Sequence, residues 1–233
     1  MRGIRLKPLG DGIHSIVLPG LDCTYSPWYE DNDFVATLEA VKNNTLVDIY
    51  RCWELWALVK QLSSSGGHVL EVGVWKGGSG CLMARSAQLA NPETRVYLCD
   101  TFTGVPKATE MDSQYKGGEH QDASIEVVQK LADDLGVKNI VILQGIFPED
   151  TAHLIADQTI SVCHIDVDVY ASAKDVFNWV WPRLCVGGAV VFSDYGCMAC
   201  DGVMRFVNEI VPVKGGLMIH NLNGNAVVIK TGT

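Results

Sequence analysis

The sequence predicts a doubly wound α/β domain whose mostly parallel sheet ends in a C-terminal antiparallel hairpin. From residue 68 onward, short apolar runs alternate with helix-length segments, and a glycine-rich turn follows the first run. Strands that alternate with helices are typical of βαβ crossovers, which place the strands in parallel. Near the C-terminus, two apolar runs flank Asn223-Gly224, a dipeptide that favours a hairpin turn.

The region before residue 68 is predicted to be helical. Residues 45–62 carry apolar side chains near one face of an amphipathic helix, at Leu46, Ile49, Trp53, Trp56 and Val59. The Ser/Gly stretch at residues 63–67 is the expected boundary. We therefore expect a helical or lid-like extension over residues 1–62 and the main domain over residues 63–233, together forming one compact unit. The extension's aromatic residues suit a lid or a core equally well: Tyr25, Trp28, Tyr29 and Phe34.

The main domain follows in a regular order. Predicted strands occupy residues 68–74, 95–99, 139–145, 160–165 and 189–192. Helical segments are expected at residues 78–90, 123–136 and 173–184, and the closing hairpin at residues 216–230. A length of 233 residues suits one such domain and does not require a second.

Composition narrows the classes of partner. The chain has 18 Lys and Arg residues against 27 Asp and Glu, a net charge of −9, which disfavours nucleic acid and anionic membrane surfaces. Neither a membrane-spanning apolar run nor a secretory signal is recognisable, so a cytoplasmic location is expected. The eight cysteines are scattered, so we expect reduced thiols, and Cys197-Met-Ala-Cys200 lacks the second ligand pair of a zinc site.

The turn after the first strand is the first candidate binding element. It runs from Glu71 to Ser79 as EVGVWKGGS and opens the following helix. Glycines there let backbone N–H groups approach a ligand closely, although they also occur in turns that only pack closely. Bulky Trp75 stands two positions after Gly73, where the dinucleotide fingerprint has a glycine. Trp75 therefore disfavours the pyrophosphate of NAD.

Asp100 ends the second predicted strand. A carboxylate at that position in an open α/β sheet is placed to accept hydrogen bonds from ribose hydroxyls, although it can also serve as a helix cap. Phe102 and the Ile146-Phe147 pair lie where an adenine ring would be sandwiched, or where an apolar loop would be anchored. The turn and Asp100 together indicate an adenosine-containing ligand.

Acidic residues follow two later strands. Asp166 and Asp168 alternate after residues 160–165, and Asp194 follows residues 189–192. If those strands are neighbours, the carboxylates meet, and they repel one another unless protonated or bridged by a cation such as Mg²⁺. A cation-bound hydroxyl loses its proton more readily, with Asp166 or Asp168 as acceptor. Other candidate bases are His120 and Lys174, while His164 is interpreted as a core histidine.

Five segments, taken together, resemble the macrocin O-methyltransferase family, whose members are metal-dependent enzymes that methylate sugar hydroxyls of natural products. The matching segments are EVGVWKGGS (71–79), CDTFTGVP (99–106), QGIFPEDT (144–151), HIDVDVYAS (164–172) and GGAVVFSDYG (187–196). The resemblance implies a Rossmann-like class I methyltransferase sheet, S-adenosylmethionine as cofactor and Mg²⁺ as metal. It further implies a small hydroxylated metabolite as the substrate. Whether the chain forms a homo-oligomer is left open.

The resemblance also assigns residues. Asp166 and Asp194 correspond to metal ligands, Ser193 stands where the family usually has a further aspartate, and Val167 stands where it tends to have glycine. Asp166 and Asp168 are the expected catalytic residues. The expected cofactor-binding residues are Glu71, Gly73, Val74, Trp75, Gly78, Ser79, Asp100, Thr101, Phe102, Gly145, Ile146, Phe147 and Asp166.

Two other functions remain open at this stage. An NAD-dependent oxidoreductase is disfavoured by Trp75 and by the acidic residues after the fourth and fifth strands. A non-catalytic ligand-binding or assembly subunit on the same fold is compatible with Ser193 in place of a carboxylate.

Overall fold

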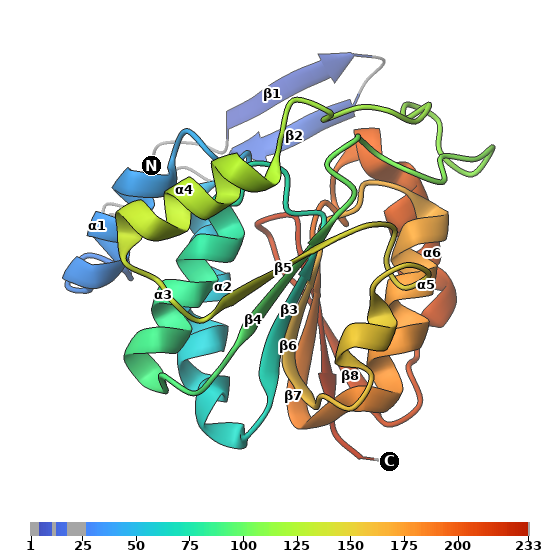
Figure 1. The fold of residues 1–233 in the computed structure, drawn as a ribbon. Helices are drawn as coiled ribbons and strands as arrows, with labels where there is room; N and C mark the ends of the chain where they lie inside the picture. Colours follow the sequence, from blue (N-terminus) through green and yellow to red (C-terminus); the bar gives the residue numbers. More distant parts are fainter. Residues whose placement is uncertain (1–4, 11–12, 18–26, 233) are drawn as a thin grey trace.

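A seven-stranded sheet forms the centre of the computed structural model, which describes residues 5–10, 13–17 and 27–232. The strand order is β5-β4-β3-β6-β7-β9-β8, with parallel pairing from β5 to β7 and antiparallel pairing for β9 and β8. The predicted doubly wound sheet with a C-terminal hairpin is confirmed. A separate two-stranded hairpin of β1 and β2 lies near the N-terminus (Figure 1).

The elements follow one another as the alternating pattern requires. The strands are β1 (Arg5–Gly10), β2 (Ile13–Val17), β3 (His68–Val72), β4 (Val96–Asp100), β5 (Ile140–Gln144), β6 (Ile160–Ile165), β7 (Leu184–Phe192), β8 (Gly216–His220) and β9 (Ala226–Lys230). The α-helices are α1 (Asn32–Val41), α2 (Ile49–Leu62), α3 (Gly78–Ala90), α4 (Ile125–Leu135), α5 (Tyr170–Val180) and α6 (Asp201–Ile210). Short 3₁₀ turns occupy Ser63–Ser65, Ala152–Ile155, Trp181–Arg183 and Met198–Cys200.

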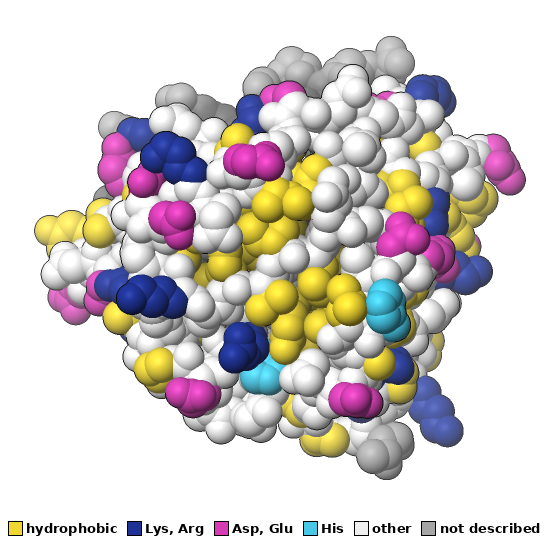
Figure 2. Space-filling view, viewed as in Figure 1, with side chains coloured by type: hydrophobic (Ala, Val, Ile, Leu, Met, Phe, Trp, Pro, Cys, Tyr) yellow, Lys and Arg dark blue, Asp and Glu magenta, His cyan; other side chains and the backbone are white. Residues whose placement is uncertain are grey.

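Each face of the sheet carries its own apolar core because successive strand residues point to opposite faces. Val69, Val96 and Leu98 face the layer of α1 to α4. Leu70 and Cys99 face the layer of α5 and α6. Figure 1 shows these two helical layers on either side of the sheet. In the same view, apolar side chains gather across the middle of the face, where the edge strand β5 lies between the layers and residues 140–142 are half-buried (Figure 2).

The N-terminal helices belong to one of these layers. Asp48 caps α2 by accepting hydrogen bonds from the N–H groups of Tyr50 and Arg51, so the helix begins four residues later than the predicted start at residue 45. The α2 side chain of Trp56 is fully buried, and Ser86 of α3 donates a hydrogen bond to its carbonyl. The division at residues 62 and 63 stays a prediction, but α2 packs against α3 as part of the sheet's cover.

The aromatic residues of the N-terminal region divide between core and surface. Phe34 is fully buried and makes an edge contact with Trp53, and Trp28 makes another with Trp53. Tyr29 is 80% exposed, and Tyr25 lies outside the described residues. Core packing therefore accounts for Phe34 and Trp28.

The closing hairpin has a longer turn than Asn223-Gly224 alone predicts. Residues 221–225 separate β8 from β9, and Gly224 has a φ of 98°. The side chains of Asn221, Asn223 and Asn225 all donate hydrogen bonds to the carboxylate of Glu54 in α2. This anchoring explains the five-residue turn.

No helix in the described part of the chain is long and apolar enough to cross a membrane.

Candidate active site

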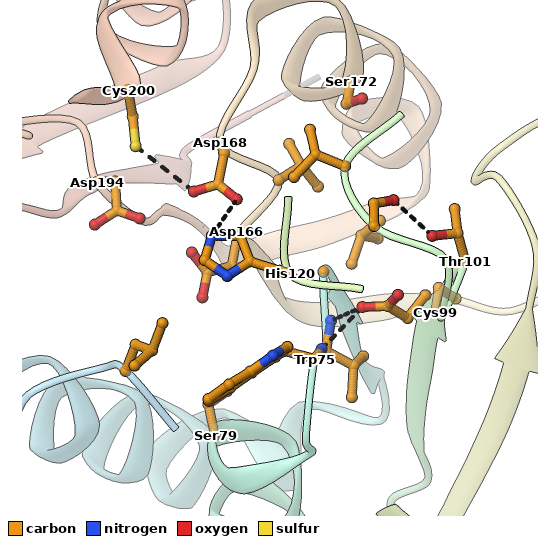
Figure 3. A pocket seen from close by; sticks show the side chains of 18 of the residues that line it. Trp75, Ser79, Cys99, Thr101, His120, Asp166, Asp168, Ser172, Asp194 and Cys200 are labelled. Atoms are coloured by element: carbon orange, nitrogen blue, oxygen red, sulfur yellow. Dashed lines mark hydrogen bonds and ion pairs between the residues drawn. The ribbon is translucent and has the colours of Figure 1, made fainter. Parts of the chain in front are cut away.

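A cavity of about 270 Å³ opens at the carboxyl ends of β3, β4, β6 and β7 (Figure 3). It lies at the topological switch point, since β4 and β6 flank β3 and their connections run to opposite faces. Ligands of open α/β sheets bind at this position. Residues 44–47 and Arg51 close one side of the cavity, and loop residues Tyr115 and His120 contribute to another.

The turn after β3 is held by Asp100. The N–H groups of Val74 and Trp75 donate to Asp100 Oδ2 at 2.7 and 2.8 Å, and Phe102 N–H donates to Oδ1 at 2.7 Å. A carboxylate has about four lone-pair sites, so three of them are engaged within the protein. Asp100 still lines the cavity, and its first role is to fix the shape of the turn.

The glycines of the turn are required by the protein's own packing. Gly73 has a φ of 89°, and a Cβ there would lie 1.8 Å from the carbonyl oxygen of Asp166. A Cβ at Gly78 would lie 2.7 Å from the backbone of Asn44. The close-packing interpretation therefore holds for both positions, whatever the ligand.

Ten of the thirteen residues expected to bind the cofactor line the cavity. They are Gly73, Val74, Trp75, Ser79, Asp100, Thr101, Gly145, Ile146, Phe147 and Asp166. Glu71, Gly78 and Phe102 are absent from its wall. Phe102 packs in the core between the sheet and the layer of α3 and α4, which supports the apolar-anchor alternative for this residue.

Glu71 points into the protein interior. Its side chain and that of His164 are fully buried, and Glu71 Oε1 lies 2.8 Å from His164 Nδ1. Burial disfavours the imidazolium, but the hydrogen bond to Glu71 and the charge of Asp166 hold the pKa of His164 above its usual value. Glu71 therefore forms a buried pair with His164 and does not line the cavity, and the cofactor contact expected there stays a prediction. The interpretation of His164 as a core histidine agrees with this position.

Asp166 and Asp194 meet in the cavity as expected. They follow the paired strands β6 and β7, and both carboxyl groups line the cavity. Burial and the charge of Asp166 raise the pKa of Asp194 to about 6, against the lowering effect of Arg51. The Asp194 carboxyl therefore resists ionisation in this site.

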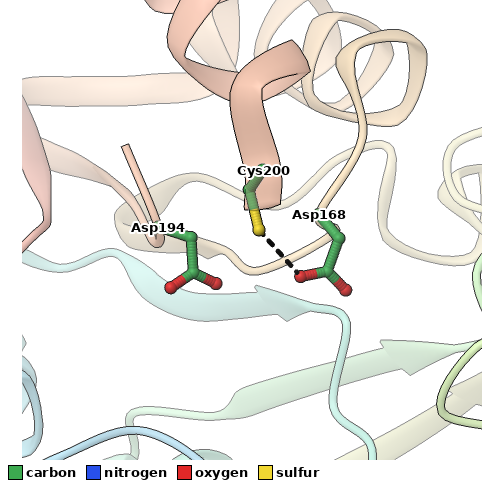
Figure 4. A group of neighbouring side chains, drawn as sticks. All are labelled: Asp168, Asp194 and Cys200. Carbon is green, nitrogen blue, oxygen red and sulfur yellow. Dashed lines mark hydrogen bonds between the residues drawn. The ribbon is translucent and has the colours of Figure 1, made fainter. Parts of the chain in front are cut away.

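Asp168 reaches the same cavity by a different backbone path from the one expected. The extended strand stops at Ile165, and Asp168 has a φ of 63°, so the simple alternation of Asp166 and Asp168 along a strand is wrong. Burial and the charges of Asp166 and Asp194 raise the pKa of Asp168 to about 8. Figure 4 shows Asp168 and Asp194 beside Cys200, whose Sγ lies 3.6 Å from Asp168 Oδ1.

Arg51 supplies a positive charge beside the carboxylates, where the sequence pattern predicted only a metal ion. Its Nη1 donates to Asp194 Oδ1 at 2.7 Å and to Ser193 Oγ at 3.1 Å. Ser193 is 1% exposed and does not line the cavity. The hydroxyl expected to bind a metal is therefore directed to a guanidinium, because α2 brings Arg51 against the end of β7.

Backbone strain gathers around the cavity. Trp75, His120, Asp168 and Asp194 all line it, and all have positive φ angles between 48° and 63°. Such conformations are costly for residues other than glycine and persist where surrounding contacts hold them, often at functional sites. No sequence signal marked Arg51, Tyr115 or Cys200, although the CxxC pair did draw attention to the segment that contains Cys200.

Comparison with known proteins identifies the family of this chain. The family model described as macrocin-O-methyltransferase (TylF) matches residues 42–215. The chain is 30% identical over 172 residues to mycinamicin III 3''-O-methyltransferase of Micromonospora griseorubida, covering 67% of each protein. It is 28% identical over 181 residues to demethyldecarbamoylnovobiocin O-methyltransferase of Streptomyces niveus, covering 71% of this chain and 67% of the relative.

Solved structures show the same fold. The O-methyltransferase NovP superposes with a TM-score of 0.69 at 24% identity, over 81% of this chain and 83% of NovP. An O-methyltransferase from Bacillus cereus superposes with a TM-score of 0.56 at 16% identity, over 86% of this chain and 92% of that one. The family match covers most of the chain, and the chain therefore belongs to the macrocin O-methyltransferase family and is an O-methyltransferase.

Proposed function

We propose that this O-methyltransferase transfers the methyl group of S-adenosylmethionine to a hydroxyl of a sugar or related natural-product metabolite, with a divalent cation such as Mg²⁺ assisting. One observation carries the proposal. A single cavity has the turn after β3 and Asp100 in its wall together with Asp166, Asp168 and Asp194. Cofactor-binding and proton-accepting groups thus face the same space.

The names of related proteins support the substrate class. They describe O-methylation of mycinamicin III, of a rhamnosyl-tetracenomycin and of demethyldecarbamoylnovobiocin. The matched regions span 64 to 67% of these relatives, so their substrates are carried over only as a class. Two structural neighbours, from Bacillus cereus and Streptomyces achromogenes, are complexes with SAH and SAM respectively.

The cavity wall fits an adenosine bearing a positively charged sulfonium. Asp100 retains a free acceptor site for a ribose hydroxyl, and Phe147 and Ile146 provide apolar surface for a base. Three carboxylates against one guanidinium leave the other side of the cavity net negative, which favours a cation. We propose Gly73, Val74, Trp75, Ser79, Asp100, Thr101, Gly145, Ile146 and Phe147 as the residues that hold the cofactor.

The acidic side fits a hard divalent cation through a revised set of ligands. Carboxylate oxygens of Asp168 and Asp194 lie within 4.8 Å of each other and of Cys200 Sγ, and Asp166 lines the same cavity. Mg²⁺ prefers carboxylate oxygens, and the repulsion among these carboxylates is what a cation would relieve. Ser193 is not included among the proposed ligands, because its hydroxyl accepts a hydrogen bond from Arg51 and its side chain does not line the cavity. When bound, the cation lowers the pKa of a substrate hydroxyl and orients it.

Asp168 is suited to accept the hydroxyl proton. Without a bound cation, burial and the charges of Asp166 and Asp194 raise its pKa to about 8, so Asp168 holds a proton at neutral pH. A cation bound to the same carboxylates would lower that pKa, and ionised Asp168, which lines the cavity, could then accept the hydroxyl proton. Asp166, which lines the same cavity, is the second candidate acceptor. Loop residue His120, with Nε2 at 4.0 Å from Asp168 Oδ2, is positioned to help pass the proton to solvent.

Calorimetry and a methyl-transfer assay test the proposal. We expect S-adenosylmethionine and S-adenosylhomocysteine to bind and NAD not to bind, and Asp166→Asn or Asp168→Asn to reduce turnover of sugar hydroxyls strongly while the cofactor still binds. Binding of NAD alone would contradict the cofactor assignment. Firm cofactor binding without turnover across a broad panel of hydroxylated compounds would instead favour a non-catalytic binding subunit.

The cytoplasmic location and the lack of nucleic-acid binding remain predictions from composition.

A further inference from the structure

Arg51 is held rigidly at the edge of the cavity. Its Nε donates to Asp48 Oδ2 at 2.7 Å, and its Nη1 bridges Ser193 Oγ and Asp194 Oδ1. Its Nη2 lies 3.4 Å from the carbonyl oxygen of Leu46, and only 14% of the side chain is exposed. The guanidinium is therefore a fixed charge with acceptors on several sides, unlike a mobile surface arginine.

The position of Arg51 in its helix is electrostatically unfavourable. It lies in the first turn of α2, next to the positive end of the helix dipole, where acidic residues are preferred. The stability of the helix alone does not account for a cation at this position. The carboxylates of Asp48 and Asp194, which accept hydrogen bonds from Arg51, account for it. Asp194 follows the end of β7 and lies 143 residues further along the chain.

The charges in the cavity can be counted. At the ends of β6 and β7, Asp166, Asp168 and Asp194 contribute three negative charges when ionised, and Asp100 at the end of β4 is a fourth carboxylate of the wall. Arg51 is the one Lys or Arg side chain among the described residues of the wall. The guanidinium reduces the ionised cluster to a net charge of about −2. It also engages Asp194 Oδ1, which leaves that residue one oxygen for another ligand.

We propose that Arg51 is an internal counter-ion that keeps the affinity of the Asp166, Asp168 and Asp194 cluster for a divalent cation low. The inference rests on the proposed metal-assisted function and adds a determinant of cation affinity to it. Coulomb's law gives the direction, since a positive charge bound to Asp194 repels a second cation bound to the same cluster. Arg51 is thus a positioning residue that acts through Asp194.

Binding of Mn²⁺ tests this directly, because Mn²⁺ takes the same carboxylate ligands as Mg²⁺ and its free form is counted by electron paramagnetic resonance. The full chain is titrated as wild type, Arg51→Met, Arg51→Lys and Arg85→Met. Arg85 in α3 pairs at 3.5 Å with exposed Asp33 and is absent from the cavity wall, so Arg85→Met is a control for the same change in net charge. Thermal unfolding monitors the folding of each variant.

We expect Arg51→Met to bind Mn²⁺ about tenfold more tightly than wild type or more. Arg51→Lys, which keeps the charge, and Arg85→Met should stay close to wild type. Unchanged or weaker binding by folded Arg51→Met overturns the inference, as does Arg51→Lys matching Arg51→Met, because then the charge is not the cause. If Arg51→Met fails to fold, Ser193→Asp, which adds a carboxylate beside the guanidinium, takes its place in the comparison. Binding of Mn²⁺ by Arg51→Lys as tight as that by Ser193→Asp then also overturns the inference. Binding by Arg51→Lys at the wild-type level, together with tighter binding by Ser193→Asp, supports it.

Failure of the inference is separable from failure of the proposed function. Saturable Mn²⁺ binding by wild type that does not respond to Arg51 removes the inference alone. Absence of Mn²⁺ binding in every variant removes the inference and metal assistance together. Titration of the same preparations with S-adenosylhomocysteine shows independently whether the cofactor assignment stands.

Discussion

The contact between Gly73 and Asp166 makes the sharpest prediction about this fold. Gly73→Ala would place a Cβ 1.8 Å from the Asp166 carbonyl oxygen and 2.6 Å from its carbonyl carbon. To reach an ordinary contact of 3.4 Å, that carbonyl would have to move by about 1.6 Å. Asp166 N–H donates to Val72 O at 2.9 Å, so the movement would strain or break the pairing of β3 with β6.

Gly66 offers a matched control. It has a φ of 82°, similar to the 89° of Gly73, but an added Cβ would meet no atom within 4 Å. A positive φ costs an L-residue about 1–2 kcal/mol, which both alanine variants should lose. Overpacking typically costs about 1–3 kcal/mol more, and only Gly73→Ala should lose that amount.

Urea unfolding at neutral pH measures the difference, and calorimetry with S-adenosylhomocysteine measures its functional effect. We expect Gly73→Ala to have a free energy of unfolding about 2 kcal/mol below that of Gly66→Ala. We also expect weaker cofactor binding in Gly73→Ala, because the displaced Asp166 backbone carries a residue of the cavity wall. Equal stability of the two variants would refute the argument that packing against Asp166 requires glycine at position 73.

Three further substitutions test other parts of the structure by urea unfolding. Trp56→Ala should lower the free energy of unfolding by about 3–5 kcal/mol, since Trp56 is fully buried beside α3; a loss under about 1 kcal/mol would show that α2 is dispensable to the core. Glu71→Gln should lower the free energy of unfolding by about 3 kcal/mol because it leaves His164 without its carboxylate, and it should leave cofactor affinity unchanged. Unchanged stability with weaker cofactor binding would instead show that Glu71 contacts the cofactor. Burial tends to raise the pKa of Asp31, but hydrogen bonds from Phe34 N–H, Lys60 and Trp56 lower it below the usual value. Asp31→Ala should therefore cost about 1–2 kcal/mol at pH 7, and its deficit should shrink as acid protonates Asp31 and removes the wild-type advantage; a deficit independent of pH would contradict this.

Much of the architecture could be predicted because it is encoded locally. The alternation of apolar runs and helical segments predicts the order of β3 to β7, and each predicted strand overlaps an observed one. Exact boundaries were less predictable: the fifth predicted strand began at residue 189, whereas β7 begins at Leu184. Tertiary pairing with β6 extends this strand across Gly187 and Gly188, which have no apolar signal.

The candidate site could be predicted in part for the same reason. Parallel strands bring their carboxyl ends to one edge, so Asp100, Asp166 and Asp194 had to lie along the same edge of the sheet once the strand order was known. Orientation was not encoded in this way. Glu71 lies on the first strand, as expected, but its side chain faces the interior and His164, which is 93 residues away.

The sequence by itself therefore determined the doubly wound sheet, its switch point and the carboxylates placed there, because hydrophobic periodicity and the positions of strand ends are local properties. The tertiary structure decided which atoms those carboxylates meet. It placed the Asp166 carbonyl against Gly73 and the guanidinium of Arg51 between Ser193 and Asp194. These contacts join elements far apart in the chain, and they form only when α2 and the sheet bury their apolar faces against a common layer.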